Sequence, residues 1–243
     1  MSAFFAAVQF LTVFPWPGSS DRSADDVGQA AVFFPVIGFL LGVILVLVNG
    51  LLEAYASPAL LSVVLVTFLT LLTRGLHLDG LSDTFDGLGA GGDRERILEV
   101  MDDSHTGAFG LIAIILLLFF KIHAIESIDT ERWRALLAAP LLGRWAMVLL
   151  GYRSQAAKPG LGSNLIDHLE TKHVFFATFI TLILVAAILQ GVGIAMMIWI
   201  AVFSVASKKY FRHRLGGITG DTFGAVGELS ETSVLVILAL RVQ

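Results

Sequence analysis

Long apolar runs, separated by short polar segments, dominate the chain. A helix needs about 17–25 apolar residues to cross a bilayer. Seven runs approach that length: Ala31–Leu52, Pro58–Thr73, Ala108–Ile128, Trp133–Gly151, Val174–Gln190, Gly193–Ser207 and Ile218–Leu240. The second and the sixth are short and the seventh contains acids, so the pattern predicts six to seven spans. We expect an all-α, polytopic integral membrane helical bundle in which residues 1–243 form one domain.

Two features lie outside this simple pattern. Residues 1–14 are apolar but lack the basic start and the cleavage site of a signal peptide. They predict an interfacial or re-entrant helix that ends at the Pro-Trp-Pro sequence of residues 15–17. Lys121 lies inside a predicted span, and with His123 and Glu126 we expect it to extend toward one interface.

Basic residues predict the orientation, because cytoplasmic loops of membrane proteins are enriched in Lys and Arg. If the basic cluster within residues 208–214 is cytoplasmic, seven spans place the N-terminus, residues 75–107 and residues 152–173 on that same side. This side then holds eleven Lys and Arg, and the opposite side holds three: Arg132, Arg134 and Arg241. The bias supports seven spans.

The composition narrows the class of protein further. Hydrophobic residues make up 56% of the chain and charged residues 15%, whereas soluble domains average roughly 25% charged residues. This composition excludes a disordered chain and argues against an ordinary soluble domain. The net charge of −4 gives no excess of positive charge for binding a nucleic acid. The absence of cysteine excludes disulfides and thiolate chemistry.

Residues 75–107 hold eight of the chain's twenty acids but only two basic residues. Asp79, Asp83 and Asp86 stand at i, i+4 and i+7, which places three carboxylates on one face of a helix. Because such neighbours repel when ionised, they need a compensating charge, and oxygen ligands favour a hard ion such as Mg²⁺. The alternative interpretation is a solvated acidic face on a cytoplasmic helix.

A second acidic patch begins the last predicted span. Asp221 and Glu228 are seven residues apart, again on one helical face, and acids in apolar spans usually face a partner, a cavity or an ion. Abundant Gly and Thr allow close helix approach. We therefore expect the two acidic clusters to meet at one membrane face and hold Mg²⁺, which commonly serves phosphate chemistry. A structural hydrogen-bond network is the alternative.

Candidate substrate contacts lie near these acids. Arg144 stands inside an apolar span and either binds phosphate or forms a buried ion pair. Lys158 is a further candidate phosphate ligand, in a segment that also predicts a turn. Ser104 either caps the next helix or contacts substrate, as Asp103 could. His77 would join the site only if its helix began after it, since on a continuous helix it points away from the acids.

With these segments in view, the sequence resembles the cobalamin synthase family (adenosylcobinamide-GDP ribazoletransferase) over nearly its whole length. The resemblance rests on GLHLDGLSDTFDG at 75–87, MDDSHTGAFG at 101–110, PLLGRWAM at 140–147 and LGGITGDTFG at 215–224. The family usually has Lys and Arg where this chain has Asp102 and His105. Two positive charges are thereby lost, so either other cations compensate, or those residues are not essential, or activity is altered.

The resemblance implies a Mg²⁺-dependent membrane enzyme of late vitamin B12 assembly. It would join adenosylcobinamide-GDP to α-ribazole or α-ribazole 5'-phosphate, release GMP, and form adenosylcobalamin or its 5'-phosphate. The implied location is the bacterial cytoplasmic (inner) membrane, with the active site facing the cytoplasm. Candidate partners, besides the substrates and the lipid bilayer, are a second copy of the chain or other late enzymes of the pathway.

The residues take three roles in this implied reaction. The metal would be held by Asp79, Asp83, Asp86, Asp221 and Glu228. The candidate catalytic residues are Asp83, Asp86 and His77, with Asp83 or Asp86 taking the proton of the attacking hydroxyl. The substrate would be contacted by Arg144, Asp103, Ser104, Lys158 and Thr219.

Two other functions fit parts of the pattern. A CDP-alcohol phosphotransferase also uses spaced aspartates on membrane helices, and residues 83–87 match the opening D-x-x-D-G of its motif, but the Ala-Arg pair that should follow is missing. A cation-coupled transporter would explain acids and an arginine in the membrane. Against it, no inverted repeat is visible and the acids gather at one face instead of the midplane.

Overall fold

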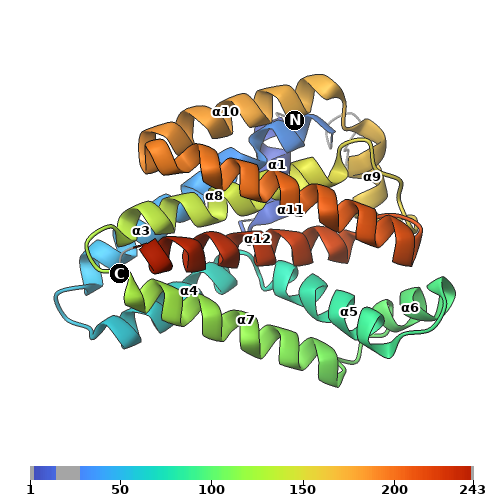
Figure 1. Ribbon diagram of the computed structural model, residues 1–243, viewed down its shortest axis with the longest axis horizontal. Coiled ribbons are helices and arrows are strands. Elements are labelled where there is room, and N and C mark those ends of the chain that lie inside the picture. Colours follow the sequence, from blue (N-terminus) through green and yellow to red (C-terminus); the bar gives the residue numbers. More distant parts are fainter. Residues whose placement is uncertain (1–2, 15–27, 242–243) are drawn as a thin grey trace.

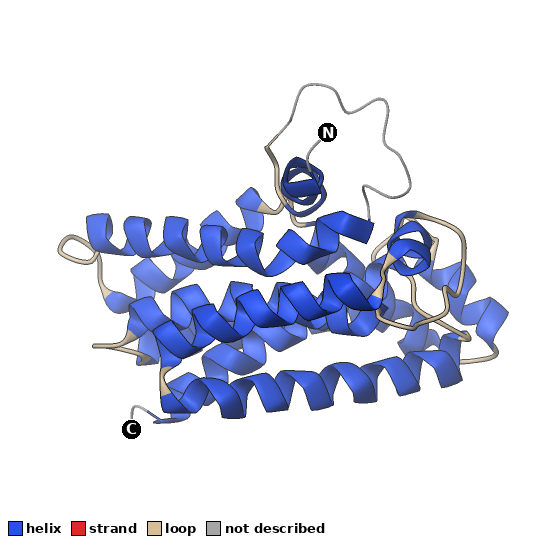
Figure 2. Ribbon diagram, turned by 90° about the horizontal axis from the view of Figure 1, so that it is seen from above, coloured by secondary structure: helices blue, strands red, loops and turns tan. Residues whose placement is uncertain are grey.

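The computed structural model describes residues 3–14 and 28–241, and these residues fold into helices without a strand (Figures 1 and 2). In chain order the helices are α1 (Ala3–Leu11), η1 (Ala31–Phe33), α3 (Phe34–Leu52), α4 (Pro58–Leu72), α5 (Leu76–Ala90), α6 (Arg94–Met101), α7 (Ala108–Ser127), α8 (Arg132–Gly151), α9 (Leu161–His168), α10 (Thr171–Leu189), α11 (Gly191–Leu215) and α12 (Gly220–Arg241). The expected all-α fold is confirmed.

Six helical segments are long and apolar enough to cross a membrane: residues 28–52, α7, α8, α10, α11 and α12. A seventh crossing is possible if α4 and α5, which are bent by 89° relative to each other, form one broken span. The predicted count of six to seven is confirmed. The sixth run, however, is not short. Helix α11 continues for 25 residues through the basic cluster, because no helix breaker occurs before Gly216, which ends it with φ +74°.

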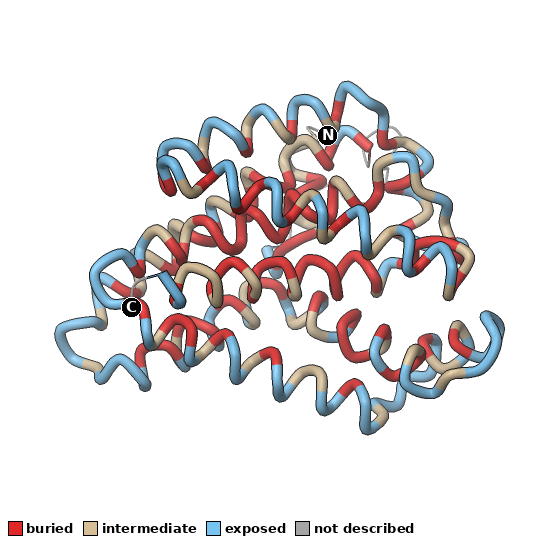
Figure 3. The backbone as a smooth tube through the Cα atoms, in the orientation of Figure 1, coloured by how far each residue is buried: buried red, intermediate tan, exposed pale blue. Residues whose placement is uncertain are grey.

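The interior is built on α8 and α12, which are buried along most of their length (Figure 3). Small residues let the helices approach closely, as in other membrane bundles. A Cβ atom at Gly38 of α3 would lie 2.3 Å from the carbonyl oxygen of Pro140 on α8. By contrast, α7, α10 and α11 expose large apolar side chains on their outer faces, including Phe119, Phe175 and Ile198. Contact with lipid would cover these faces.

Helix α1 packs on the bundle through Ala6, Ala7 and Leu11, and Figure 2 shows the N-terminal helix crossing over one face of the bundle. The N–H of Val13 donates to the carbonyl oxygen of Leu72 at 2.7 Å, which ties the end of α1 to the end of α4. The expected helix end at residues 15–17 lies outside the described residues. The interfacial position of this helix stays a prediction.

The acidic segment, expected as a cytoplasmic helix or loop, forms helix α5 in its first half, and this helix packs within the bundle. The chain turns between α4 and α5 at Arg74 and Gly75, which both have left-handed backbone conformations with φ of +57° and +65°. Helix α5 then runs beside α12 and α7. The approach to α12 is so close that a Cβ atom at Gly80 would lie 2.7 Å from the carbonyl oxygen of Asp221. Glycine at this position is what permits the contact.

Asp86 joins α5 to the start of α7. Its carboxylate oxygens accept hydrogen bonds from the backbone N–H of Gly107 at 2.8 Å and of Gly110 at 2.9 Å. Two of the free N–H groups at the helix start are thereby satisfied, in a place where the helix dipole also favours a negative charge. Of the two roles considered for Ser104, the helix cap is not found, because the N-cap position of α7 is Gly107.

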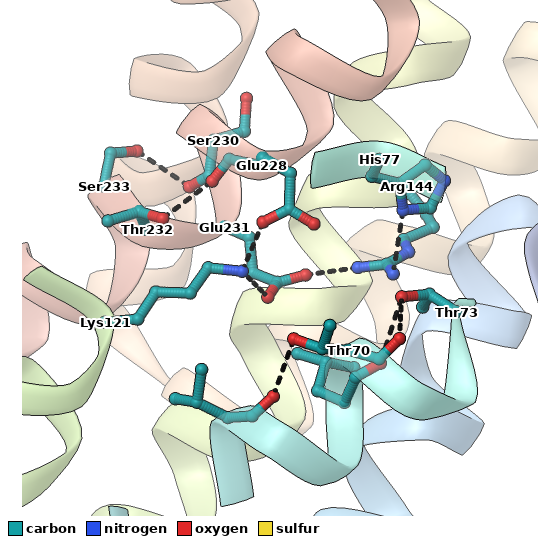
Figure 4. A network of polar contacts seen from close by, with 12 residues as sticks. Thr70, Thr73, His77, Lys121, Arg144, Glu228, Ser230, Glu231, Thr232 and Ser233 are labelled. Carbon is teal, nitrogen blue, oxygen red and sulfur yellow. Dashed lines mark hydrogen bonds and ion pairs between the residues drawn. The ribbon is translucent and has the colours of Figure 1, made fainter. Parts of the chain in front are cut away.

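Four charged side chains form a buried group that we call the central ion cluster: Lys121, Arg144, Glu228 and Glu231 (Figure 4). The Lys121 Nζ atom lies 2.5 Å from Glu228 Oε2 and 2.6 Å from Glu231 Oε1. Arg144 pairs with the other oxygen of Glu231. Each of the four residues is at most 5% exposed. Two cations therefore balance two anions within the bundle.

This cluster corrects the expectation for Lys121. Its side chain does not extend toward an interface with His123 and Glu126, which pair with each other at 2.9 Å instead. An isolated charge in an apolar bundle is very costly, whereas two carboxylates from α12 satisfy the Lys121 ammonium in place. The cluster thus fixes α7 and α8 against α12.

Replacing Lys121 by Met would leave Glu228 without its partner. Breaking a buried ion pair in this way typically costs about 3–5 kcal/mol, so we expect Lys121→Met to lower the unfolding midpoint of the detergent-solubilised protein by on the order of 10 °C. The control is Lys172→Met, since the Lys172 side chain is 58% exposed. Equal midpoints for both variants would show that the cluster does not hold the bundle together.

Candidate active site

A cavity of about 1000 Å³ opens where the end of α1, the α4–α5 turn, the segment before α9 and the start of α12 meet. Its polar lining comes from all of these elements and includes Arg74, His77, Asp79, Ser82, Lys158 and Asp221. Phe10, Leu78 and Phe223 supply apolar surface. Figure 1 places α5, α6, α9 and the start of α12 at one end of the molecule. The basic end of α11 lies there too.

The structure brings Asp79, Asp83 and Asp221 together from two distant stretches of sequence. The contact between Gly80 and the backbone of Asp221 sets α5 directly against the first turn of α12. The charges of Asp79, Asp86 and Asp221 all act on the carboxylate of Asp83. The partly exposed Asp83 therefore lies among other acids, an arrangement that favours a cation nearby.

Lys158 is the cation that the chain itself supplies to this group. Its Nζ atom lies 3.5 Å from Asp221 Oδ2 and also contacts Asp102. Partial burial alone would lower the pKa of Lys158, but the hydrogen bonds and charges of Asp102 and Asp221 outweigh it and raise that pKa above its usual value. Lys158 is therefore protonated throughout the neutral range.

The segment that carries Lys158 is fixed to its surroundings by backbone contacts. The N–H of Ala157 donates to the carbonyl oxygen of Ile218 at 2.9 Å, and the N–H of Ile218 donates to that of Gln155 at 2.8 Å. Arg94 of α6 donates to the carbonyl oxygen of Ala157 at 2.9 Å. These bonds hold the backbone next to Lys158 beside the start of α12. The Lys158 ammonium group is therefore placed near Asp221 by the backbone as well as by its own side chain.

His77 lies at the junction between the cavity and the central ion cluster. It is buried in the first turn of α5 and lines the cavity, although the helix begins one residue before it. Arg144 Nη2 lies 3.4 Å from His77 Nδ1, and His77 Nε2 has no partner among the described residues (Figure 4). The expectation that a continuous helix would exclude His77 from the site was wrong, because the cavity extends around the start of α5.

Two predicted ligands lie with the central ion cluster instead of the cavity. Arg144 is 2% exposed and pairs with Glu231, so of its two interpretations the buried ion pair is the correct one. Glu228 pairs with Lys121. Seven residues correspond to roughly 10 Å along a helix, which carries Glu228 away from Asp221 and into the bundle. Neither side chain lines the cavity.

Other predicted contacts have local structural partners. Thr219 is buried, and its side chain and that of Thr222 each accept a hydrogen bond from the other's backbone N–H, which caps α12. Asp103 and Ser104 are exposed between α6 and α7 and do not line the cavity. Asp103 Oδ1 lies 2.6 Å from His105 Nδ1, and this hydrogen bond holds the pKa of Asp103 below its usual value.

Arg74 and Ser82 line the cavity but were not predicted. Arg74 is exposed and is one of three described non-glycine residues with a positive φ. Such a conformation is uncommon outside glycine and is often found at functional sites. One signal was available in the sequence, since Arg74 directly precedes the acidic motif at the end of an apolar run. Ser82 gave no signal apart from its place between the aspartates.

Asp79 and Asp221 line the cavity, and Asp83, which does not line it, lies close enough for their charges to act on it. These three carboxylates are the candidate oxygen donors for a cation. Within residues 3–14 and 28–241, no group of three or more Asp, Glu or His side chains could hold a metal ion by itself. Mg²⁺ takes one or two carboxylates in enzymes and completes its coordination with waters and substrate phosphates. The donor set therefore fits Mg²⁺ bound together with a phosphate-bearing substrate.

Comparison with known proteins gives the family. The model of the cobalamin-5-phosphate synthase family matches residues 3–239. A protein of Geotalea daltonii is 38% identical over 236 residues, covering 97% of this chain and 96% of its own length. One from Syntrophobacter fumaroxidans is 37% identical over 239 residues, covering 96% of each chain. A third, from Pseudomonas syringae pv. syringae, is 38% identical over 247 residues, covering 99% and 100%.

All three relatives are named adenosylcobinamide-GDP ribazoletransferase. No solved structure matches the chain. Both the family match and the relatives span nearly its whole length, and the relatives exceed a third in sequence identity. The chain therefore belongs to the cobalamin-5-phosphate synthase family.

Proposed function

We propose that this protein transfers the adenosylcobinamide phosphate group of adenosylcobinamide-GDP to α-ribazole or α-ribazole 5'-phosphate, with release of GMP. The observation that carries the proposal is that Asp79, Asp221 and Lys158 line one cavity, with Asp83 close enough for the charges of all three to act on it. Full-length relatives that carry the name of this transferase give independent support. The products would be adenosylcobalamin or its 5'-phosphate.

The cavity suits a large substrate that carries a diphosphate. Its volume of about 1000 Å³ lies at the upper end of the usual range for ligand sites. Apolar residues such as Phe10 and Phe223 offer surface to a bulky ring system, while Arg74 and Lys158 offer positive charge to phosphate oxygens. Charged and apolar lining in one cavity matches a substrate with both kinds of surface.

The reaction needs a hydroxyl deprotonated and a phosphate leaving group released. A ribose hydroxyl of the acceptor attacks the phosphorus nearest the corrinoid, the bond from that phosphorus to GMP breaks, and the hydroxyl proton passes to a base. Asp83 is the base in this proposal, because both oxygens of Asp86 already accept backbone hydrogen bonds. Lys158 and Arg74 position the diphosphate. His77 is a further candidate for contact with substrate at the deep end of the cavity.

Mg²⁺ fits this site as a cofactor. One or two carboxylates from the set Asp79, Asp83 and Asp221 would hold it, and it would offset negative charge on the diphosphate and on the departing GMP. Lys158 cannot do this alone, since it is a single charge that already contacts two carboxylates.

The active site faces the cytoplasm of a bacterial inner membrane in this proposal. The cavity lies toward the end of the bundle where α11 finishes in Arg212, His213 and Arg214. Positive charge marks the cytoplasmic side of membrane proteins. Guanine nucleotides and GMP are handled in that compartment, so this orientation gives the donor and the leaving group direct access.

The purified protein in detergent should convert adenosylcobinamide-GDP and α-ribazole into adenosylcobalamin with stoichiometric GMP. Chelation with EDTA should abolish turnover, and excess Mg²⁺ should restore it. A CDP-linked lipid alcohol serves as the competing donor, and CMP release is measured in parallel. Release of CMP without conversion of the corrinoid would instead identify a CDP-alcohol phosphotransferase, and undiminished turnover in EDTA would remove Mg²⁺ from the proposal.

The carboxylates can be tested one at a time. We expect Asp83→Asn to lower kcat by about 10²–10⁴-fold, the usual contribution of a catalytic acid–base group, and Asp221→Asn to lower kcat because a proposed metal ligand is lost. Both variants should also need more Mg²⁺ for half-maximal activity, with an unfolding midpoint close to that of the wild type. The matched control is Asp167→Asn, an exposed acid on α9 that does not line the cavity. Wild-type kcat in both site variants would overturn the assignment.

A further inference from the structure

A second cavity, of about 570 Å³, lies at the end of the bundle away from the candidate active site. It is formed where α8 begins, α10 turns into α11 and α12 ends. Figure 1 shows the C-terminus and this turn at the end opposite α6 and α9. Arg134, Gln190, Trp199 and Arg241 give the cavity its polar groups, and residues such as Met196 and Ile237 give it apolar surface. A smaller adjoining cavity of about 200 Å³ shares both arginines.

Three Lys or Arg residues were expected on the non-cytoplasmic side: Arg132, Arg134 and Arg241. Two of them, Arg134 and Arg241, line this cavity. The third, Arg132, is buried, and its Nε donates to the carbonyl oxygens of Ile125 at 3.3 Å and Ile128 at 2.9 Å. Arg132 is thus used by the fold. Arg134 and Arg241 come from opposite ends of the chain's second half and line the same cavity. Lys and Arg are generally depleted on the non-cytoplasmic side of membrane proteins.

Neither of these two arginines is fully satisfied by the protein. Arg134 Nη1 pairs with Glu131 at 3.0 Å, and Arg134 also stacks on Trp133, but its buried Nε has no hydrogen-bond partner in the described part of the chain. No described residue forms an ion pair with Arg241. Two arginines and one glutamate leave a net charge of +1 at the cavity. A phosphodiester carries one negative charge and would balance it, whereas a phosphate monoester carries close to two.

The surroundings resemble a site for a lipid more than a site for a soluble anion. Tryptophan is enriched where membrane helices pass from hydrocarbon to headgroups, and Trp199 lies at this cavity with its indole N–H donating to Ser233 at 3.1 Å. Helix α11 also exposes Ile194, Ile198 and Val202, each about 60% exposed. Those side chains could lie along an acyl chain whose headgroup reaches the arginines.

We propose that Arg134 and Arg241 bind the phosphodiester of an anionic phospholipid at this end of the bundle. The guanidinium groups bind the phosphate oxygens through paired hydrogen bonds, the apolar lining and the outer face of α11 hold the upper part of an acyl chain, and Trp199 lies at headgroup level. Basic pockets between membrane helices bind acidic headgroups in this way. The lipid ties α8, α11 and α12 together, independently of the reaction at the other cavity.

Lipid binding can be measured on the full-length protein after purification in a neutral detergent. Phosphatidylglycerol, phosphatidylcholine and inorganic phosphate are added separately, and the unfolding midpoint and the number of lipids retained in native mass spectrometry are recorded. We expect phosphatidylglycerol to raise the midpoint and to be retained, with no effect from phosphatidylcholine or inorganic phosphate. An equal response to inorganic phosphate would show a site for free anions, and an equal response to phosphatidylcholine would show no headgroup recognition.

The double variant Arg134→Gln/Arg241→Gln should lose affinity for phosphatidylglycerol by about tenfold or more, the effect expected from losing charge-assisted hydrogen bonds. The exposed Lys172→Gln variant is the matched control and should retain the wild-type affinity. If the glutamine variant does not fold, Arg134→Lys/Arg241→Lys keeps both charges but removes the paired geometry, and it should still bind phosphatidylglycerol more weakly than the control does. Unchanged phosphatidylglycerol binding in whichever double variant folds would overturn the proposal.

Discussion

The balance of buried charge organises this protein. Lys121 and Arg144 place two cations inside an apolar bundle, and Glu228 and Glu231 of α12 form ion pairs with them. Because an unpaired charge at this depth would cost several kcal/mol, α12 has little freedom to shift along α7 and α8. The position of α12 along α7 and α8 also determines where its first turn lies. Asp221 is in that turn, so its position is determined as well.

Outside the central ion cluster, negative charge exceeds positive charge among the acids near the first cavity. Among the described residues, Lys158 is the cation that forms an ion pair with Asp221 and acts on Asp83, and Arg74 lines the same cavity. Surplus negative charge alone would repel a diphosphate, so in our proposal a divalent cation here balances it. Helix α12 thus carries two kinds of acid: Glu228 and Glu231, which form buried ion pairs, and Asp221, which is partly exposed in the first turn beside Lys158. Depth along α12 separates the two groups.

The sequence predicted the fold well because apolar length is a local property. The spans, their number and the helical face shared by Asp79 and Asp83 all follow from spacing within one segment. Contacts between side chains of different segments do not follow from spacing within one segment. The pattern around Lys121 was compatible with an interface position until Glu228 and Glu231 were seen beside it. Glu228 was likewise assigned to the metal because its spacing from Asp221 shows a shared face but not the depth.

Smaller errors have the same origin. Asp86 was grouped with its neighbours on one helical stripe, yet it accepts two backbone hydrogen bonds from the start of α7, twenty-one and twenty-four residues later. Arg74 was overlooked, because only the 89° bend between α4 and α5 brings it to the cavity. Both outcomes depend on how α5 packs, and the glycines that allow this packing carry no chemical signal of their own.

The contact between α5 and α12 is therefore the claim to test most directly, and a chain without native cysteine allows it. Leu81 of α5 and Ala225 of α12 are buried in one small apolar cluster. The double variant Leu81→Cys/Ala225→Cys should form an intramolecular disulfide under mild oxidation in native membranes, whereas Leu81→Cys/Val205→Cys, with its second site on the exposed face of α11, should not. A folded 81–225 variant that forms no disulfide, or equal yields for both pairs, would contradict the account.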